Sequence, residues 1–536
     1  MNFDSLYNPY QSKRTTIYAK NGMVATSQPL ASEAGLEMLK KGGNAIDAAI
    51  ATAACLTVVE PPSNGIGGDA FAIVWVKDKI YGLNSSGPAP AGLSIDGVKK
   101  LGYDKMPRYG WLPVTVPGVP AAWAALSKRF GRLPFAELFE PAIRYAEEGF
   151  PVSPVLAKYW DTKGKEYDDL EPDLLQNWKD LFMIDGKPPK AGEIWKSQGH
   201  ADTLRSIAET KAESFYRGEL AQKIGQYAQA SGGYLSVDDL AAFEPEWVDP
   251  ISINYRGYDV WEMPPNGQGI NTLIALNILK EYKSLQLDSI DTLHKQIEAM
   301  KLAFTDGKYY TTDPKYMEEG IVEELLSDSY AAERRKLIGD TAITPSVVRP
   351  QSVGTVYLAT ADGEGNMVSF IQSNYDGFGS GVVIPGTGIS MQNRGADFSL
   401  NPSDPNVLAP GKRSYHTIIP GFLTKDGNAV GPFGVMGSFM QPQGHLQVVM
   451  SIVDFDLNPQ AALDARRWRW IDDKKVKVEP DFPDHLAQGL VRKGHHIEKT
   501  LDEDGFGRGQ IILRDPETGV LMGGTESRTD ANIACW

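Results

Sequence analysis

Apolar positions in the first part of the chain alternate between helix-like and strand-like spacing. Residues 32–43 repeat apolar side chains at helical intervals before a pair of glycines, which predicts a helix with Ser32 as its N-cap. The segment 45–59 is rich in alanine and apolar on nearly every face, which predicts a helix packed closely against a sheet. The continuous apolar runs 71–76 and 80–84 predict two buried strands.

The middle of the chain, 117–310, has mainly helical spacing. One strand-like piece, 251–263, interrupts it, and the polar stretch from 311 to 353 predicts one helix, 323–338, followed by a loose connection. The clearest helical segments of the middle region are 121–130, 135–149, 271–282 and 289–304.

The pattern changes at Gly354. Residues 355–374 form two apolar runs joined by an Asp/Gly/Asn turn, and 414–437 repeats this arrangement around Asp426 and Gly427, so we expect two β-hairpins. Two helices, 443–455 and 459–468, and three further strands, near 474–480, 510–515 and 519–526, complete the pattern. Hairpins beside helical segments predict an α+β fold.

Composition and charge narrow the function. The chain has 536 residues, long enough for a large core, and a net charge of −15, which argues against a nucleic-acid partner. Its two cysteines, Cys55 and Cys535, form no disulfide framework. The most apolar stretch, 45–59, is shorter than the roughly 20 residues that span a membrane, and the polar start lacks a secretion signal. We therefore expect a cytoplasmic enzyme with no membrane partner.

Common cofactor and metal motifs are absent from the sequence. The seven histidines fall in no HExxH or CxxC arrangement, so no metal is expected. The glycine-rich pieces 65–71 and 377–381 lack the lysine of a phosphate loop, and neither offers the G-x-S-x-G of a serine hydrolase. By itself each piece predicts a tight turn, and no cofactor is indicated.

Several motifs in the same order resemble the γ-glutamyltransferase (γ-glutamyltranspeptidase) family. They are GGNAIDAAIATAACLTVVEPPSNGIGGDAFAIVW at 42–75, MPPNGQGINTLIALNIL at 263–279, and the segment 355–399, which begins TVYLATADGEGNMVSFIQSN. LAPGKRSYHTIIP, VMGSFMQPQGH and NPQAALDARRWRW continue the match. The resemblance implies a four-layer αββα sandwich of the N-terminal-nucleophile hydrolase type. Within the family, the sequence is similar in pattern to the bacterial subgroup that includes cephalosporin and glutaryl acylases.

The resemblance also implies self-cleavage between Gly354 and Thr355. This would divide one sandwich domain into a large subunit, 1–354, and a small subunit, 355–536. By pattern alone Thr355 is only a β-branched residue that opens a strand. As a freed N-terminus, however, its α-amino group has a pKa of about 7.7–8.0. The amine can then act as the base for its own hydroxyl, which attacks an amide and passes the acyl group to water or an amine.

Other roles follow from the resemblance at matching positions. Ser373 corresponds to the hydroxyl that orients the nucleophile, and Gly437 and Ser438 to the pair whose backbone N–H groups form the oxyanion hole. Asp397 corresponds to the carboxylate that binds the γ-glutamyl amino group. Each also has a structural interpretation: a polar strand face for Ser373, a turn for the Gly-Ser pair, and an Asx cap for Asp397.

The sequence departs from the family in the glutamate pocket. The arginine that binds the substrate carboxylate should fall in 85–94, SSGPAPAGLS, which contains none; Arg394 or Arg108 could replace it. The family's serine pair corresponds to His416 and Thr417. Its asparagine in the nucleophile hairpin corresponds to Tyr375 or, after a one-residue shift, to Asn374. The short connection from Asp397 to His416 predicts an open pocket.

Three functions remain open from the sequence. The first is hydrolysis of small-molecule γ-glutamyl amides such as glutathione, with possible transfer to an amine. The second is a glutaryl or cephalosporin-type acylase of the same mechanism. The third is an unprocessed, non-catalytic relative that acts as a binding protein. The sequence is compatible with a homo-oligomer.

Overall fold

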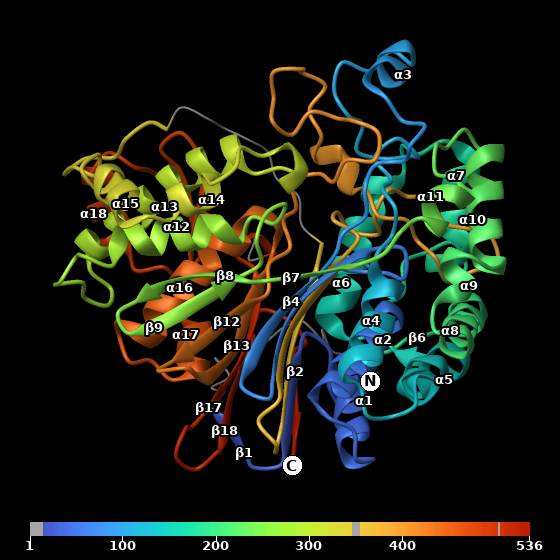
Figure 1. Ribbon diagram of the computed structural model, residues 1–536, viewed down its shortest axis with the longest axis horizontal. Helices are drawn as coiled ribbons and strands as arrows, with labels where there is room; N and C mark the ends of the chain where they lie inside the picture. The colour runs from blue at the N-terminus through green and yellow to red at the C-terminus, as the bar shows by residue number, and fades with distance from the viewer. Residues whose placement is uncertain (1–13, 346–353, 502–503) are drawn as a thin grey trace.

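Two seven-stranded antiparallel sheets form the centre of the protein in a computed structural model, which describes residues 14–345, 354–501 and 504–536 (Figure 1). The first sheet has the order β19 (Asn532–Cys535), β2 (Gly22–Thr26), β10 (Val356–Asp362), β11 (Met367–Ser373), β3 (Asp69–Val76), β4 (Lys79–Ser85) and β7 (Glu246–Val248). The second has the order β1 (Ile17–Ala19), β18 (Leu521–Thr525), β17 (Arg508–Arg514), β13 (Asn428–Met436), β12 (Gly421–Lys425), β9 (Tyr258–Glu262) and β8 (Ile251–Tyr255). Two smaller sheets pair β14 (Trp468–Asp472), β15 (Lys475–Val478) and β16 (His496–Lys499), and β5 (Phe150–Pro151) with β6 (Ile194–Trp195).

Helices pack on both central sheets, which confirms the predicted α+β class (Figure 1). In the first part of the chain they are α1 (Pro29–Lys40), α2 (Ala45–Val59), α3 (Ile95–Lys100), α4 (Val119–Phe130), α5 (Glu140–Glu148), α6 (Pro154–Gly164), α7 (Pro172–Phe182), α8 (Gln198–Thr210), α9 (Glu213–Tyr216), α10 (Glu219–Ala230) and α11 (Val237–Ala241). They continue with α12 (Gly269–Leu279), α13 (Ile290–Tyr310), α14 (Ile321–Leu325), α15 (Asp328–Arg335), α16 (Gln441–Val453), α17 (Pro459–Asp464) and α18 (Asp484–Arg492).

Helix α2 is the buried helix that the alanine-rich pattern predicts. Asn44 accepts hydrogen bonds from the N–H groups of Ile46 and Asp47, and the Asp47 side chain accepts from the Asn44 N–H, which forms a capping box. Every residue of α2 is buried, and the helix packs on β10 and β11. Because alanine side chains are small, the helix can approach these two strands closely.

Some predicted boundaries were wrong. Helix α1 begins before Ser32: the Gln28 side chain caps it, and the Ser32 hydroxyl donates to the Pro29 carbonyl inside the first turn. The strand-like piece 251–263 is a hairpin, β8–β9, that turns at Arg256 and Gly257, both with positive φ. Three other predictions change in extent: 323–338 is two short helices, 459–468 ends in a strand, and residues 414–420 precede the strand β12.

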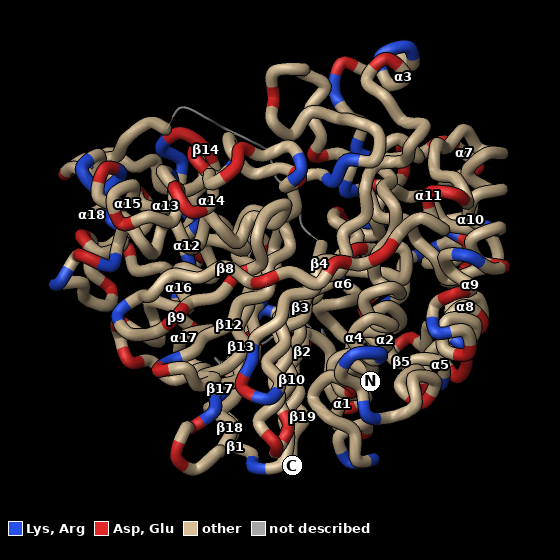
Figure 2. The backbone as a smooth tube through the Cα atoms, in the orientation of Figure 1, with Lys and Arg blue, Asp and Glu red and all other residues tan. Residues whose placement is uncertain are grey.

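Three apolar clusters hold these layers together. One lies between α2 and the first sheet, and a second joins α12 and α16 to the second sheet. The third is formed by side chains that the two sheets direct toward each other, among them Phe71, Tyr357, Ile371, Phe422 and Ile512. Acidic and basic residues are scattered over the outer helices and loops, while the central strands are largely without charge (Figure 2).

The chain on either side of Gly354 shares one sheet. Strand β10 pairs with β2, β11 pairs with β3, and β19 pairs with β2, so strands from after Gly354 pair on both sides with strands from before it. The β10–β11 register places Val356 opposite Gln372, which sets Thr355 across from Ser373 at the same sheet end. Among the described residues, no helix has the length and apolar character needed to cross a membrane.

Candidate active site

Three oxygen atoms converge at the start of β10. The Ser373 hydroxyl donates to the Gly354 carbonyl at 2.6 Å. The Thr355 hydroxyl donates to the same carbonyl at 2.6 Å and lies 3.0 Å from the Ser373 oxygen. The backbone N–H of Tyr375 donates to the Ser373 oxygen at 2.8 Å, which leaves the serine proton free to point at Gly354. The predicted nucleophile and its partner hydroxyl therefore lie against the predicted scissile carbonyl.

Residue 354 is in a place that only glycine fits. A Cβ added to Gly354 would lie 2.6 Å from the Gly377 nitrogen and 2.8 Å from the Asp376 carbonyl carbon. Both neighbours are backbone atoms, which cannot move aside without shifting the loop after β11. Thr355 itself is 1% exposed, so its contacts are made away from bulk water.

Tyr375 and Asp397 are in direct contact within the site. The Tyr375 hydroxyl donates to Oδ1 of Asp397 at 2.7 Å, while Oδ2 of Asp397 has no hydrogen-bond partner within the described residues. Burial raises the pKa of Asp397, and the charges of Arg394 and Lys308 act in the opposite direction. A buried carboxylate oxygen without a hydrogen bond is costly, and a ligand ammonium could supply that hydrogen bond.

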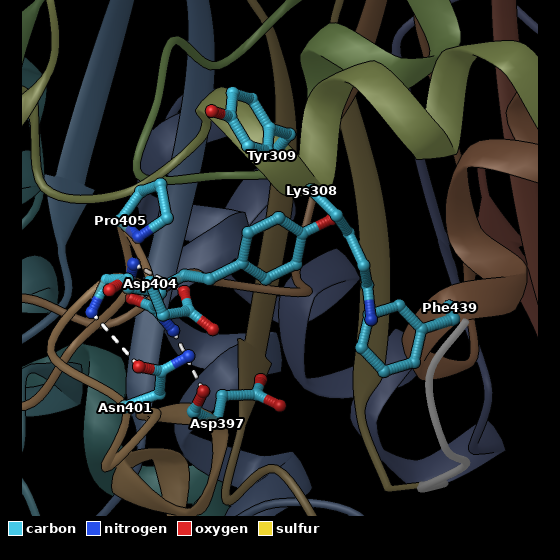
Figure 3. Close-up of a pocket in the computed structure, with 10 residues that line it drawn as sticks. Lys308, Tyr309, Asp397, Asn401, Asp404, Pro405 and Phe439 are labelled. Carbon is cyan, nitrogen blue, oxygen red and sulfur yellow. Dashed lines mark hydrogen bonds between the residues drawn. The ribbon is translucent and has the colours of Figure 1, made fainter. Parts of the chain in front are cut away.

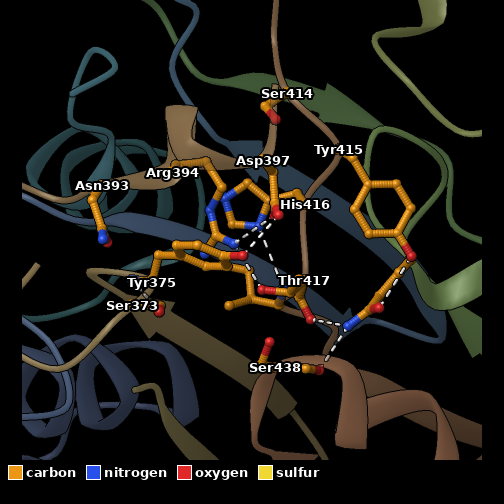
Figure 4. Close-up of polar contacts among 12 residues, drawn as sticks. Ser373, Tyr375, Asn393, Arg394, Asp397, Ser414, Tyr415, His416, Thr417 and Ser438 are labelled. Atoms are coloured by element: carbon orange, nitrogen blue, oxygen red, sulfur yellow. Dashed lines mark hydrogen bonds and ion pairs between the residues drawn. The ribbon is translucent and has the colours of Figure 1, made fainter. Parts of the chain in front are cut away.

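Arg394 lies next to this pair, on the short 3₁₀ turn Arg394–Asp397 (Figure 4). The residue is 1% exposed; its Nη1 donates to the Thr417 hydroxyl at 2.7 Å and lies 4.0 Å from Oδ2 of Asp397. Its Nε and Nη2 have no hydrogen-bond partner in the part of the chain that the structure describes. Burial lowers the pKa of Arg394, while the charges of Asp397 and Asp69 act in the opposite direction.

Both ring nitrogens of His416 are occupied by hydrogen bonds within the protein. Its Nε2 donates to Oδ2 of Asp69 at 3.1 Å, and its Nδ1 accepts from the Ile418 N–H at 3.3 Å. Burial lowers the pKa of His416 well below its usual range and raises that of Asp69 to about 7. Both ring nitrogens are therefore used in holding neighbouring segments, and Thr417 is the member of the predicted pair that reaches Arg394.

The structure distinguishes Tyr375 from Asn374, and Arg394 from Arg108, at the two positions where the sequence left alternatives open. Asn374 packs into the glycine turn at 65–68, where a Cβ on Gly65 or Gly68 would lie within 2.8 Å of its side chain. Of Tyr375 and Asn374, therefore, Tyr375 contacts Asp397. Arg108 forms a two-point ion pair with Asp376, at 2.6 and 2.9 Å, and is already neutralised there.

The predicted oxyanion pair forms a strained turn between β13 and α16. Gly437 has a φ of 137° and Ser438 a φ of 52°, both in the region that favours glycine. Nε2 of Gln268 donates to the Ser438 carbonyl at 2.8 Å and to the Thr417 carbonyl at 2.6 Å. Gln268 immediately precedes α12, and our sequence reasoning missed it. The only signal was its place in the PPNGQG motif.

A cavity of about 240 Å³ opens next to Asp397 (Figure 3). Helix α13, the loop 401–406 and the segment around Phe439 enclose it. Its lining residues are Lys308, Tyr309, Asp397, Asn401, Ser403, Asp404, Pro405, Asn406, Tyr415 and Phe439. The cavity is large enough for part of a small acyl amide.

One group of possible metal ligands occurs among the described residues, outside this cavity. His294, Glu298 and His495 bring one ligand atom each within 4.8 Å of the others. However, Nδ1 of His294 lies 2.8 Å from Nε2 of His495 in a hydrogen bond, and Glu298 forms an ion pair at 2.8 Å with Lys301. The lysine ammonium thus already supplies the cation that the carboxylate needs.

Comparison with known proteins identifies the class to which this fold and site belong. The sequence model of the family described as Gamma-glutamyltranspeptidase matches residues 31–536. The chain therefore belongs to the gamma-glutamyltranspeptidase family, and it is an enzyme, which leaves the non-catalytic alternative without support.

Three relatives show the range of this family. The crystal structure of a cephalosporin acylase from Bacillus halodurans superposes with a TM-score of 0.97 at 63% sequence identity, over 100% of this chain and 99% of that one. The glutathione hydrolase-like YwrD proenzyme of Bacillus subtilis is 38% identical over 95% of this chain and 97% of its own. The oxamate amidohydrolase proenzyme of Klebsiella pneumoniae is 32% identical over 96% of this chain and 98% of its own.

Proposed function

We propose that this protein is a self-processing N-terminal-threonine amidohydrolase that cleaves γ-glutamyl amides such as glutathione. In this proposal the two sheets and their helices form the four-layer αββα sandwich of that enzyme class. The contact of the Thr355 and Ser373 hydroxyls with the Gly354 carbonyl carries the proposal, because it presents a nucleophile and a donor to one amide bond. The relatives named as proenzymes support maturation by cleavage.

Maturation begins when the Thr355 oxygen attacks the Gly354 carbonyl carbon. The C–N bond breaks, the hydroxyl proton passes to the Thr355 nitrogen, and an ester links Gly354 to the threonine oxygen. The Ser373 hydroxyl donates a hydrogen bond to the Gly354 carbonyl oxygen as negative charge develops on that oxygen. Water then hydrolyses the ester and leaves Thr355 with a free α-amino group and a free hydroxyl.

Turnover uses the same oxygen with a better base. The new α-amino group takes the hydroxyl proton while the oxygen attacks the γ-amide of the substrate. The backbone N–H groups of Gly437 and Ser438 would stabilise the oxyanion, and the amine leaves after it accepts the proton. Water, or a second amine in the transfer reaction, attacks the acyl-enzyme and regenerates Thr355.

Arg394 and Asp397, whose hydrogen bonding within the described residues is incomplete, match the head group of a γ-glutamyl substrate. Its α-carboxylate can accept from Nε and Nη2 of Arg394, and its α-ammonium can donate to Oδ2 of Asp397. A zwitterionic amino-acid group would satisfy both residues at once, whereas an acyl group with only a carboxylate would satisfy one. This pairing favours γ-glutamyl amides as the substrate class.

A gel and a substrate pair test the proposal. Wild-type protein should give two bands that fit 354 and 182 residues, and Thr355→Ala should stay intact and inactive. Wild type should hydrolyse γ-glutamyl-p-nitroanilide much faster than glutaryl-p-nitroanilide, which lacks the α-amino group. An intact wild-type band, or a Thr355→Ala protein with normal activity, would contradict the mechanism.

A second candidate is an acylase that acts on glutaryl-like groups. One observation favours it: within the site, Tyr375 and Arg394 lie so close to Asp397 that the aspartate can serve to hold them instead of a substrate amine. The resemblance to the cephalosporin acylase points the same way. Faster hydrolysis of the glutaryl substrate in the comparison above would decide for this candidate.

A further inference from the structure

Asp69, the first residue of β3, completes a row of polar side chains at one end of the first sheet. In the register of β3 and β11, Asp69 lies opposite Ser373, and the β10–β11 register sets Ser373 across from Thr355. Residues directly opposite each other on paired strands place their side chains on the same face of the sheet. The buried Asp69 carboxylate therefore lies on the face that carries the proposed nucleophile, two strands away from it.

Three hydrogen-bond donors from separate segments converge on this carboxylate. Oδ1 of Asp69 accepts from the Gly87 N–H at 3.3 Å, and Oδ2 accepts from Nε2 of Gln392 and from Nε2 of His416, both at 3.1 Å. Because all three partners are donors, the ionised carboxylate, whose two oxygens only accept, fits this place. An amide of the same shape would present a donor of its own to at least one of them.

Two of these partners lead to Arg394 from opposite ends of that residue. Oε1 of Gln392 accepts from the backbone N–H of Arg394 at 2.9 Å. His416 precedes Thr417, whose hydroxyl accepts from Nη1 of Arg394 at 2.7 Å (Figure 4). Asp69 thus holds the segments that fix both the backbone of Arg394 and its guanidinium.

Arg394 depends on such anchors because few contacts hold its guanidinium directly. Its Nε and Nη2 have no hydrogen-bond partner among the residues that the structure describes. The centre of the Tyr375 ring lies 4.2 Å from the guanidinium carbon, so the ring covers one face of the group. The direction in which the remaining N–H groups point then depends on where residue 394 and Thr417 are held. A group held in place before the substrate arrives binds more tightly, because less conformational entropy is lost.

The geometry points to Asp69 as a positioning residue that fixes Arg394 relative to Thr355 and thereby sets the affinity for acyl groups that carry a carboxylate. The inference rests on the proposed function, in which Arg394 binds that carboxylate and Thr355 attacks the acyl carbon. Asp69 belongs to the sheet of the nucleophile and its partners hold the arginine, so it joins the two ends of the acyl site. Because γ-glutamyl and glutaryl groups both carry a carboxylate, the role is the same for either substrate class.

Kinetics of processed protein on γ-glutamyl-p-nitroanilide test this role, with glutaryl-p-nitroanilide in its place if that is the faster substrate. Asp69→Asn should raise KM about tenfold and change kcat less than about twofold, because binding loses a pre-positioned partner while the nucleophile keeps its own contacts. In an Arg394→Gln background no guanidinium is left to position, so Asp69→Asn should change KM less than about twofold.

A second variant tests the same connection without altering the carboxylate. Gln392→Met removes the acceptor of the Arg394 N–H and the donor to Asp69, and it should raise KM as Asp69→Asn does. It also keeps the test available if the Asp69 variant fails to fold.

Asp47→Asn is the matched control. Asp47 is also buried, and its carboxylate accepts from the backbone N–H groups of Arg132 and Leu133. It lies in the first turn of α2, where the Ala45 N–H donates to Asp362 at the other end of β10 from Thr355. This variant should lower the melting temperature and leave KM unchanged.

The same rise in KM for Asp69→Asn with and without Arg394 would overturn the inference, because Asp69 would then act by another route. An unchanged KM in both Asp69→Asn and Gln392→Met would overturn it as well. A loss confined to kcat would also do so, since it would assign Asp69 to the nucleophile. A processed wild type that cleaves neither γ-glutamyl- nor glutaryl-p-nitroanilide would instead overturn the proposed function.

Discussion

At the scale of single residues, the site is organised by hydrogen-bond donors that converge on one carbonyl oxygen. Ser373 owes its position to its place at the end of β11, opposite Thr355, and its orientation to the Tyr375 N–H. Arg394 and Asp397 owe theirs to a short 3₁₀ turn that buries Arg394 and leaves Asp397 half-buried beside it. Each residue can therefore be removed with a distinct expected effect.

Replacement of Ser373 by alanine should slow self-cleavage about 10²-fold, because one donor to the developing oxyanion is lost. The measurement is the fraction of intact chain on a denaturing gel against time after synthesis. Ser369→Ala is the control. Ser369 lies on the same strand, and the substitution also removes a buried serine hydroxyl, but that hydroxyl contacts Tyr357. Equal cleavage rates in Ser373→Ala and wild type would show that the serine does not act on this carbonyl.

Replacement of Arg394 by glutamine should raise KM for γ-glutamyl-p-nitroanilide roughly tenfold to hundredfold, since a charged hydrogen bond to the substrate carboxylate is removed. Self-cleavage should proceed, because the bond between Gly354 and Thr355 presents no such carboxylate. Steady-state kinetics and the gel together separate the two effects. A normal KM in a fully processed variant would assign the carboxylate to another residue.

At the scale of elements, the site joins pieces that are distant in the chain. The turn before α12 provides Gln268, which ties the segment at Thr417 to the β13–α16 turn at Ser438. The β10–β11 hairpin holds the proposed nucleophile, Thr355, at its end. In the proposed mechanism, the position of the oxyanion donor Ser438 therefore depends on Gln268, which holds the turn through the Ser438 carbonyl.

Gln268→Leu should lower kcat by about 10²-fold with a smaller change in KM, because the strained turn at Ser438 loses one of its anchors. Gln460→Leu, which removes a buried glutamine bonded to the Thr525 carbonyl, is the control for loss of a buried amide. Steady-state kinetics on processed protein, with the melting temperature of both variants, tests this. If kcat falls equally in both variants, in proportion to their loss of melting temperature, Gln268 has no positioning role.

The capping box of α2 gives a prediction about stability. Asn44→Ala removes the acceptor of two backbone N–H groups and should lower the free energy of unfolding by about 1–2 kcal/mol, as measured by urea denaturation. Ser94→Ala, the same kind of change at the mostly exposed helix α3, should cost less. Activity of the folded Asn44→Ala protein should match wild type, because the cap lies outside the site.

At the scale of the whole molecule, cleavage at Thr355 should not separate the two segments. Strands β10, β11 and β19 come from after the proposed cleavage point and pair with β2 and β3 from before it. The apolar cluster between the sheets also draws side chains from both segments. Dissociation would expose these strand edges and this core to water.

Processed protein should therefore elute from gel filtration as one species that contains both chains, while a denaturing gel separates them. The unprocessed Thr355→Ala protein, which has the same total mass, is the reference for the elution volume. Elution of a separate species with the mass of 182 residues would show that the interleaved sheet does not hold after cleavage.

The sequence by itself determined the features that depend on neighbouring residues. The helix 45–59, the hairpin 355–374 and the change of character at Gly354 all follow from local spacing, turn residues and capping. The order of several family motifs also identified Thr355, Ser373 and Asp397 as the residues to follow.

Only the tertiary structure decided which side chains meet across distant segments. It showed that Tyr375, not Asn374, contacts Asp397; that Arg394 is incompletely hydrogen-bonded while Arg108 is neutralised by Asp376; and that Gln268 reaches Ser438 at all. Spacing along the chain fixes the face of an element on which a side chain lies. Its partner, however, depends on how loops and helices hundreds of residues apart pack together, and this information is not local.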